Sequence, residues 1–165
     1  MPDGARVQLF QACVRTPFAT LGITASDTHV TGIRFLPPSV AAKAPARNTI
    51  AYLACVQLQA YLDNPKFILD VPIRLSGTHH RLAVWEAMQR IPAGRTSTYG
   101  ELAAQIGSSA RAVGGACGSN PIPVVVPCHR VIAAGGDIGG FMGARGNEGF
   151  EIGIKRWLLE HEGDF

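Results

Sequence analysis

Cys128 stands among residues that could support nucleophilic chemistry. It follows Pro127 and an apolar run at residues 124–126, which we expect to be a buried strand. His129 and Arg130 come directly after it. An imidazole and a guanidinium beside a thiol offer a base and a positive field, which lower the thiol pKa and raise the thiolate fraction. Adjacent side chains of a strand point to opposite faces, so contact between Cys128 and His129 requires a turn or a bridging water.

A Cys-His pair alone is often coincidental, so the elements that precede it matter. Thr98 is the expected N-cap of one short helix, which ends at Gly107, and Ser109 is expected to cap a second helix over residues 110–118. Two helices joined by so tight a turn resemble a helix-turn-helix. The second helix has few side chains and carries Arg111 in its first turn, which suits close approach to DNA. Core packing without DNA binding is an equal alternative for the helix pair alone.

The remaining elements are expected to form a scaffold. The patterns predict two or three strands within residues 1–36, a helix over 49–62, a strand over 67–75, a helix over 80–91 and a final helix over 154–163. Residues 144–153 are expected to form an acidic link before that final helix. The face of the final helix that docks on the core is expected to carry Ile154, Trp157, Leu158 and His161.

Composition fits one ordinary domain or two small lobes. Of the 165 residues, 47% are hydrophobic and 16% are charged, with a net charge of +3. No signal peptide and no apolar run of membrane-spanning length is visible, so we expect a cytoplasmic monomer with no membrane and no obligate protein partner.

The basic residues are unevenly distributed along the chain. Residues 78–130 carry five Arg against two Glu, whereas residues 137–165 carry three basic and six acidic side chains. The middle segment is therefore expected to face phosphates and the tail is not. Ordinary surface arginines explain the charge count equally well.

Cys13, Cys55 and Cys117 are expected to be small core residues. The chain has no C-x-x-C pair, and Cys13 with His29 does not reproduce a four-ligand zinc set. We predict no metal and no other cofactor.

Several motifs in order resemble a known family. They are TYGEL at residues 98–102, ARAVGGACGSNPIP at 110–123, PCHRV at 127–131 and IKRWLLEHEG at 154–163. Together they resemble the O6-alkylguanine-DNA alkyltransferases, also called methylated-DNA–protein-cysteine methyltransferases. The resemblance is specific over residues 78–143 and the final helix, and the first half matches only in general layout.

The resemblance implies an α/β protein of two lobes. Residues 1–76 would form a ribonuclease H-like scaffold of a small β-sheet plus a helix. It would be packed on a mostly helical lobe, residues 77–165, that contains the helix-turn-helix and the alkyl acceptor.

The resemblance also implies a DNA repair reaction. Methyl or other alkyl groups would move from O6-alkylguanine, and from O4-alkylthymine, in nucleotides flipped out of double-stranded DNA. Cys128 corresponds to the acceptor, His129 to a general base acting through a water, and Glu162 to the carboxylate that orients it. Asn120 corresponds to the residue that ties the helix-turn-helix to the active-site strand. The thioether product has no acid-base route back to a thiol, so each molecule reacts once.

The family's DNA and base contacts carry over position by position. Arg111 resembles the arginine that fills the gap left by the extruded nucleotide, and Tyr99 the tyrosine that contacts the base and the flanking phosphate. The other residues expected at the DNA are Ala110, Gly114, Gly115 and Arg130. The residues expected in the base pocket are Val131, Phe141, Met142 and Gly143. Met142 departs from the small polar residue found in some members, which bears on the range of alkyl groups accepted.

Other functions fit parts of the same pattern. A non-catalytic lesion-binding relative would replace the cysteine, and Cys128 is present. A helix-turn-helix regulator could use Cys128 as a redox or alkylation sensor, although residues 1–75 suggest no ligand or dimerisation domain. A cysteine hydrolase would need an oxyanion hole and repeated turnover.

Overall fold

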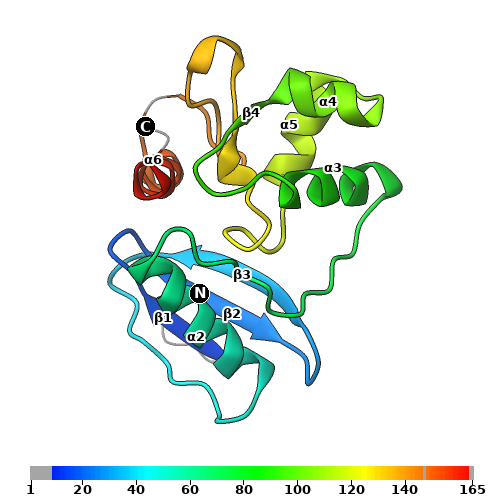
Figure 1. Cartoon of the computed structure of the whole chain (residues 1–165). Coiled ribbons are helices and arrows are strands. Elements are labelled where there is room, and N and C mark those ends of the chain that lie inside the picture. The colour runs from blue at the N-terminus through cyan, green and yellow to red at the C-terminus, as the bar shows by residue number, and fades with distance from the viewer. Residues whose placement is uncertain (1–8, 147, 164–165) are drawn as a thin grey trace. The chain divides into compact units, whose positions relative to one another are not determined.

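The computed structural model describes residues 9–146 and 148–163. They divide into two compact units, one reaching to Leu75 and the other starting at Ser76, one residue from the boundary that the sequence predicts. Figure 1 shows the elements of both units. Within the described residues, no helix combines the length and the apolar character that a membrane crossing needs.

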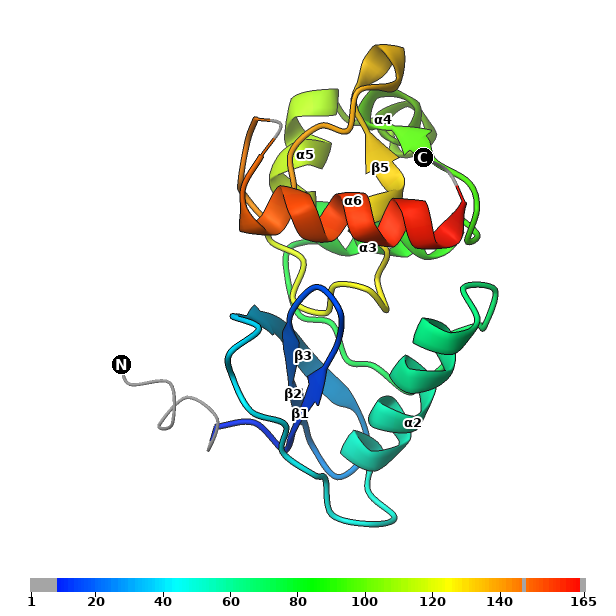
Figure 2. The same ribbon diagram turned by 90° about the vertical axis from the view of Figure 1, so that its left-hand side faces the viewer.

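The N-terminal unit is a small antiparallel sheet with one helix. Its strands are β1 (Ala12–Arg15), β2 (Thr20–Ala25) and β3 (Val30–Leu36), in the order β1-β2-β3. Helix α2 (Ile50–Asp63) covers one face of the sheet, as Figures 1 and 2 show. Thr49 caps it, and its hydroxyl accepts the Tyr52 N–H. The mixed α/β class is as expected, and the ribonuclease H-like comparison stays a prediction.

The strand predicted over residues 67–75 is wrong. Only an isolated bridge forms there, between Ile73 and Val30 of β3. The Val30 N–H donates to the Pro72 carbonyl at 2.8 Å, and the Arg74 N–H donates to the Val30 carbonyl at 2.9 Å. Pro72 has no N–H, so the ladder of hydrogen bonds cannot continue past it.

The C-terminal unit is mostly helical. In chain order it contains α3 (His79–Gln89), β4 (Ser97–Thr98), α4 (Tyr99–Ile106), α5 (Ala110–Gly118), the 3₁₀ turn η1 (Cys128–Arg130), β5 (Val131–Ile132), the 3₁₀ turn η2 (Ala134–Gly136) and α6 (Phe150–Glu162). Strands β4 and β5 pair in parallel, with Ser97 opposite Val131. This pairing joins the residues just before α4 to those just after Cys128.

The predicted caps of α4 and α5 are confirmed. The Thr98 hydroxyl accepts the Glu101 N–H at 3.0 Å, and the Ser109 hydroxyl accepts the Ala112 N–H at 3.2 Å. Gly107 ends α4 in the left-handed conformation, with φ +67°. The turn between the two helices is therefore fixed by local side chains and one glycine.

The strand predicted over residues 124–126 is wrong. The segment is a tight turn in which the Val126 N–H donates to the Ile122 carbonyl at 2.9 Å and Val124 has φ +75°. A β-branched residue rarely adopts that conformation. The prolines at 121, 123 and 127 remove backbone donors, so the segment cannot join a sheet as an ordinary strand.

The final helix differs from the prediction at its start and in its buried face. Helix α6, seen lengthwise in Figure 2, begins at Phe150 and not at Ile154, which shortens the expected link. Trp157 and His161 are half-buried and stack on one another, with ring centroids 4.7 Å apart. The buried residues of the helix are Ile152, Ile154, Lys155, Leu158, Leu159 and Glu162.

Two glycine substitutions test these helix assignments. Gly107→Ala forces a side chain into a left-handed position and should lower the free energy of unfolding by about 1 kcal/mol. Gly153→Ala lies within α6, where an added Cβ meets nothing within 4 Å. This change should raise the free energy of unfolding by about 0.5–1 kcal/mol. Urea unfolding of both variants beside the parent chain measures the difference. Equal effects of the two changes would contradict the assignments.

Candidate active site

Cys128 is the first residue of η1 and is nearly buried, with 3% of its surface exposed. Its backbone N–H donates to the Val126 carbonyl at 2.8 Å, and its carbonyl accepts the Val131 N–H that closes the turn. The turn replaces the expected strand, so Cys128 and His129 do not alternate between two faces of a sheet. The thiol is held on backbone that hydrogen bonds fix on both sides.

The expectation of a lowered thiol pKa is wrong for the resting protein. Burial raises the pKa of Cys128 to about 11, against smaller lowering effects of the Asn120 side chain and the Lys155 charge. The Arg130 guanidinium does not supply the expected field at the sulfur, because it is bound to Glu162. The resting thiol is therefore protonated at neutral pH.

His129 and Glu162 form a buried pair. His129 is fully buried, and its Nε2 lies 2.8 Å from Glu162 Oε2. Burial disfavours the charge on Glu162, but hydrogen bonds from His129 and Arg130 hold its pKa well below the usual range. Burial lowers the pKa of His129, although Glu162 opposes the change. At neutral pH the carboxylate is therefore ionised and the imidazole is neutral, with Nε2 as the donor.

The other nitrogen of the His129 ring has the character of a base. Because Nε2 donates to Glu162, Nδ1 of the neutral ring carries a lone pair. Among the described residues, Nδ1 is the only buried side-chain polar atom without a hydrogen-bond partner. Buried polar atoms are nearly always paired, so an orphan of this kind marks a place where chemistry or a water is expected.

Arg130, which was predicted to contact DNA, makes hydrogen bonds within the unit. Its Nε and Nη2 donate to the two oxygens of Glu162 at 2.8 and 3.0 Å, and its Nη1 donates to the Ile91 carbonyl at 2.6 Å. Only 12% of the side chain is exposed. These bonds give the guanidinium a structural role within the unit, and its predicted contact with DNA stays a prediction.

Asn120 links the end of α5 to the segment before Cys128. Its Nδ2 donates to the Val126 carbonyl at 2.7 Å, and its Oδ1 accepts the Ile122 N–H at 3.0 Å. Asn120 is 3% exposed. Its side chain therefore satisfies backbone groups on both limbs of the turn that precedes the thiol.

Lys155 of α6 is a site residue that the sequence analysis missed. It is fully buried, and its Nζ donates to the carbonyls of Val131 at 2.7 Å and Gly140 at 2.8 Å. The same nitrogen lies 5.7 Å from the centre of the Tyr99 ring. Burial lowers the pKa of Lys155 to about 8. Lys155 thus ties the glycine-rich loop after residue 138 to the strand that follows Cys128.

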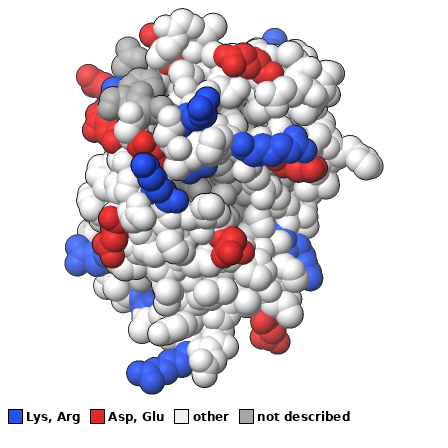
Figure 3. Space-filling view, viewed as in Figure 1, with Lys and Arg blue, Asp and Glu red and all other residues white. Residues whose placement is uncertain are grey.

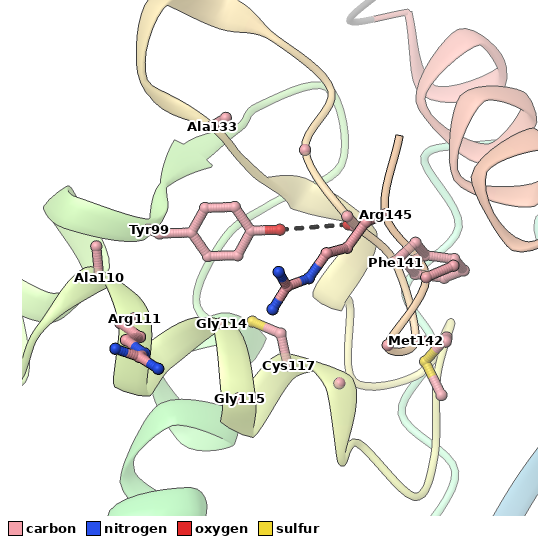
Figure 4. A pocket seen from close by; sticks show the side chains of 15 residues that line it. Tyr99, Ala110, Arg111, Gly114, Gly115, Cys117, Ala133, Phe141, Met142 and Arg145 are labelled. Carbon is pink, nitrogen blue, oxygen red and sulfur yellow. Dashed lines mark hydrogen bonds between the residues drawn. The ribbon is translucent and has the colours of Figure 1, made fainter. Parts of the chain in front are cut away.

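A cavity of about 780 Å³ opens beside these residues (Figure 4). Its volume is that of a small-molecule or nucleotide site. Several residues predicted at the DNA line it, namely Tyr99, Ala110, Arg111, Gly114 and Gly115. Phe141, Met142 and Gly143 of the predicted base pocket line it as well. Among the described residues, Val131 and Cys128 do not form part of the lining, and no Asp or Glu does.

Tyr99 bridges the cavity wall. Its hydroxyl donates to the Gly140 carbonyl at 3.3 Å, the bond drawn in Figure 4. Burial raises the pKa of its phenol, so the hydroxyl keeps its proton throughout the physiological range. A protonated phenol that lines a cavity can donate to a bound base.

Met142 and Gly143 form the turn that closes the cavity next to Cys128. Phe141 and Ala144 exchange backbone hydrogen bonds at 3.0 and 2.9 Å, and both central residues have positive φ, +50° at Met142 and +86° at Gly143. This is the pattern of a type I′ turn. A left-handed conformation costs a non-glycine residue roughly 1–2 kcal/mol. The turn directs the Met142 thioether to within 3.9 Å of the Cys128 sulfur.

Cys117 and Arg145 are among the lining residues that were not predicted. Cys117 was expected to be a core residue; it is 7% exposed and also lines the cavity, with its pKa raised to about 12 by burial. Arg145 belongs to the tail that was expected to avoid phosphates. Figure 4 shows its side chain reaching over the cavity, with Arg111 on another side. On the face drawn in Figure 3, acidic and basic side chains are interspersed.

Comparison with known proteins agrees with this geometry. A family model described as 6-O-methylguanine DNA methyltransferase, DNA binding domain, matches residues 79–164. A methylated-DNA–protein-cysteine methyltransferase of Mycolicibacterium paratuberculosis is 37% identical over 151 residues, which cover 87% of this chain and 90% of that protein. A Thermus thermophilus protein named DNA base-flipping protein is 38% identical over 152 residues, covering 90% and 96%.

The fold agrees as well. The crystal structure of the O6-methylguanine methyltransferase of Mycobacterium tuberculosis matches with a TM-score of 0.74 and 37% identity, covering 91% of this chain and 90% of that one. The M. tuberculosis protein in complex with DNA also matches with a TM-score of 0.74, at 38% identity. By its sequence and its fold, this chain belongs to the methylated-DNA–protein-cysteine methyltransferase family.

Proposed function

We propose that this protein repairs DNA by moving the alkyl group of O6-alkylguanine onto the sulfur of Cys128, once per molecule. One observation carries the proposal. The Cys128 thiol, next to the His129–Glu162 pair, lies directly behind Met142 in the wall of a cavity that Tyr99 and Arg111 also line. The relative named O6-methylguanine methyltransferase, and its complex with DNA, support the substrate.

The helix pair α4 and α5 is the proposed helix-turn-helix. Arg111 lies in the first turn of α5 and is exposed, and Gly114 and Gly115 leave the next turn without side chains. An added Cβ at either glycine would meet nothing within 4 Å, so the space over the helix is open to a DNA backbone. A base enters the cavity only after leaving the stack, at a cost of about a few kcal/mol, and the Arg111 guanidinium offsets part of that cost by filling the gap.

His129 prepares the nucleophile. Its Nδ1 accepts the proton of the Cys128 thiol through a water, and the imidazolium is stabilised by the ionised Glu162. The resting thiol, with its pKa near 11, is thus converted to thiolate only when the proton has a destination.

The transfer step is an in-line displacement. The sulfur of Cys128 forms a bond to the alkyl carbon, and the bond between that carbon and O6 breaks with its electron pair moving onto guanine. The guanine anion takes up one proton from water, while the His129 imidazolium returns the thiol proton to water, so the protons balance. The Tyr99 hydroxyl in the cavity wall keeps its own proton and can donate a hydrogen bond to the departing base. The thioether at Cys128 has no acid-base route back, so the reaction ends there.

Base flipping without transfer is the second candidate, because one relative is named a DNA base-flipping protein. Flipping needs Arg111, Tyr99 and the cavity, but it needs no thiol. A cysteine on an ordered turn beside a buried His–Glu pair is a costly arrangement for flipping alone, which favours transfer.

Mass spectrometry after reaction with DNA tests the proposal. A duplex oligonucleotide containing O6-methylguanine should add one methyl group per protein, on the peptide that contains Cys128. The Cys117 peptide should remain unmodified, because its buried thiol donates to the Met88 sulfur and its neighbours in the chain include no histidine to take its proton. Cys128→Ser should add none and still bind the duplex. Binding without methyl transfer by the parent chain would favour the base-flipping candidate, and repeated turnover would favour a hydrolase.

Arg111 should matter for duplex DNA and not for a free base. Arg111→Ala should slow transfer from duplex O6-methylguanine by about tenfold or more, since the lost gap-filling contact is a term of about 1–3 kcal/mol. Transfer from free O6-benzylguanine should stay near the parent rate. Arg34→Ala, which removes the same charge from an exposed position of β3 in the N-terminal unit, is the matched control. Equal losses with both substrates would exclude a role in flipping.

The pH dependence of Cys128 in the free protein tests the assigned protonation state. Because its pKa is raised to about 11, about one molecule in a thousand carries the thiolate at pH 8. Alkylation by iodoacetamide should therefore rise about tenfold per pH unit from pH 7 to pH 9. Peptide mass spectrometry follows the rate at Cys128. A plateau near neutral pH would mean that the thiol pKa is lowered in the resting protein.

A further inference from the structure

We propose that Met142 is a gate on Cys128, and that this gate limits the size of the alkyl group that the protein accepts. The inference rests on the proposed function for its substrate. It rests on the geometry of this chain for everything else.

Met142 borders both the thiol and the cavity. It lines the cavity, and its sulfur lies 3.9 Å from the sulfur of Cys128, which is 3% exposed and, among the described residues, no part of the lining. An alkyl carbon that undergoes in-line attack must come to about 3–3.5 Å from the sulfur. The thioether occupies that neighbourhood, so it has to move before the reaction.

The contact also favours the unreactive form of the thiol. At this separation the Cys128 S–H donates a weak hydrogen bond to the Met142 sulfur. A thiolate has no proton to donate and meets the lone pairs of the thioether instead. While the gate is closed, it covers the Cys128 sulfur and keeps the thiol protonated until an alkylated nucleobase enters the cavity.

The backbone suits a gate of this kind. The turn is fixed by the reciprocal bonds between Phe141 and Ala144, and Lys155 anchors the preceding Gly140 carbonyl. The side chain of Met142, in contrast, is unbranched, half-buried and free to change rotamer without moving the turn. Strained residues held by their surroundings are common at functional sites, and Met142 with φ +50° is one.

The gate predicts a size limit. A methyl group needs little more room than the displaced thioether leaves, whereas a benzyl group needs a larger displacement into the cavity. One extra or missing methylene in an apolar pocket already discriminates substrates by about 10–200-fold. Met142 should therefore slow transfer from O6-benzylguanine more than transfer from O6-methylguanine.

Met142→Asn is the informative variant. Asn-Gly is a favoured pair for a type I′ turn, so the variant should fold with the same backbone while the thioether is lost. Met142→Leu keeps the volume without the sulfur and is the matched control. Thermal unfolding of both variants checks that they fold.

The first measurement needs no DNA. Iodoacetamide labelling at pH 8, followed on the Cys128 peptide, should be about tenfold faster in Met142→Asn if the gate is closed about 90% of the time. Met142→Leu should label close to the parent rate. The Cys55 peptide of the N-terminal unit serves as the internal reference. Unchanged labelling in Met142→Asn, or equally fast labelling in Met142→Leu, would overturn the gate.

The second measurement uses two duplexes, with O6-methylguanine or O6-benzylguanine at the same position. The ratio of benzyl to methyl transfer should rise about tenfold in Met142→Asn. An unchanged ratio would overturn the size limit. If the parent chain transfers neither group, the proposed function fails, and the labelling result still decides whether Met142 covers the thiol.

Discussion

The carboxylate of Glu162 holds together the elements around the nucleophile. It accepts bonds from His129 and from two nitrogens of Arg130, and Arg130 continues to the Ile91 carbonyl beyond α3. One buried carboxylate thus connects the last turn of α6, the 3₁₀ turn of Cys128 and the end of α3. Removing one partner of a buried ion pair strands the other and typically costs about 3–5 kcal/mol. The same bonds that stabilise the unit also fix the tautomer of the proposed base.

Burial of the thiol has two opposite effects on reactivity. It holds the sulfur rigidly beside a cavity, which favours attack on a bound carbon, and it raises the pKa, which leaves little thiolate in the empty protein. A reagent consumed in one reaction gains from this combination, because a permanently exposed thiolate would react with any electrophile. In the proposed function, the reactivity of Cys128 is therefore coupled to the entry of the alkylated guanine into the cavity.

Local signals in the sequence were sufficient for α4, α5 and their caps. Thr98, Gly107 and Ser109 act through neighbours within four residues, so their roles follow from the chain itself. The segment at 124–126 was mistaken for a strand because its valines outweighed the prolines around them. The buried face of α6 was misassigned because Lys155 was not considered for it, while Glu162 was assigned to the site by the resemblance and not by its place on the helix. Ile152, Lys155, Leu159 and Glu162 recur at spacings of three, four and three, a helical stripe that would have placed both charges inside.

No local pattern in the sequence predicts the position of Arg145 or the raised pKa of Cys128. The position of Arg145 over the cavity depends on how the glycine-rich loop folds back, and the pKa depends on how much apolar protein surrounds the sulfur. Glu162, which pairs with His129, lies more than thirty positions further along the chain. On the ribosome Cys128, the proposed acceptor, thus emerges well before Glu162, which completes the proposed base. In the proposed mechanism, the buried pair that takes the thiol proton is therefore complete only after α6 has been made and has docked.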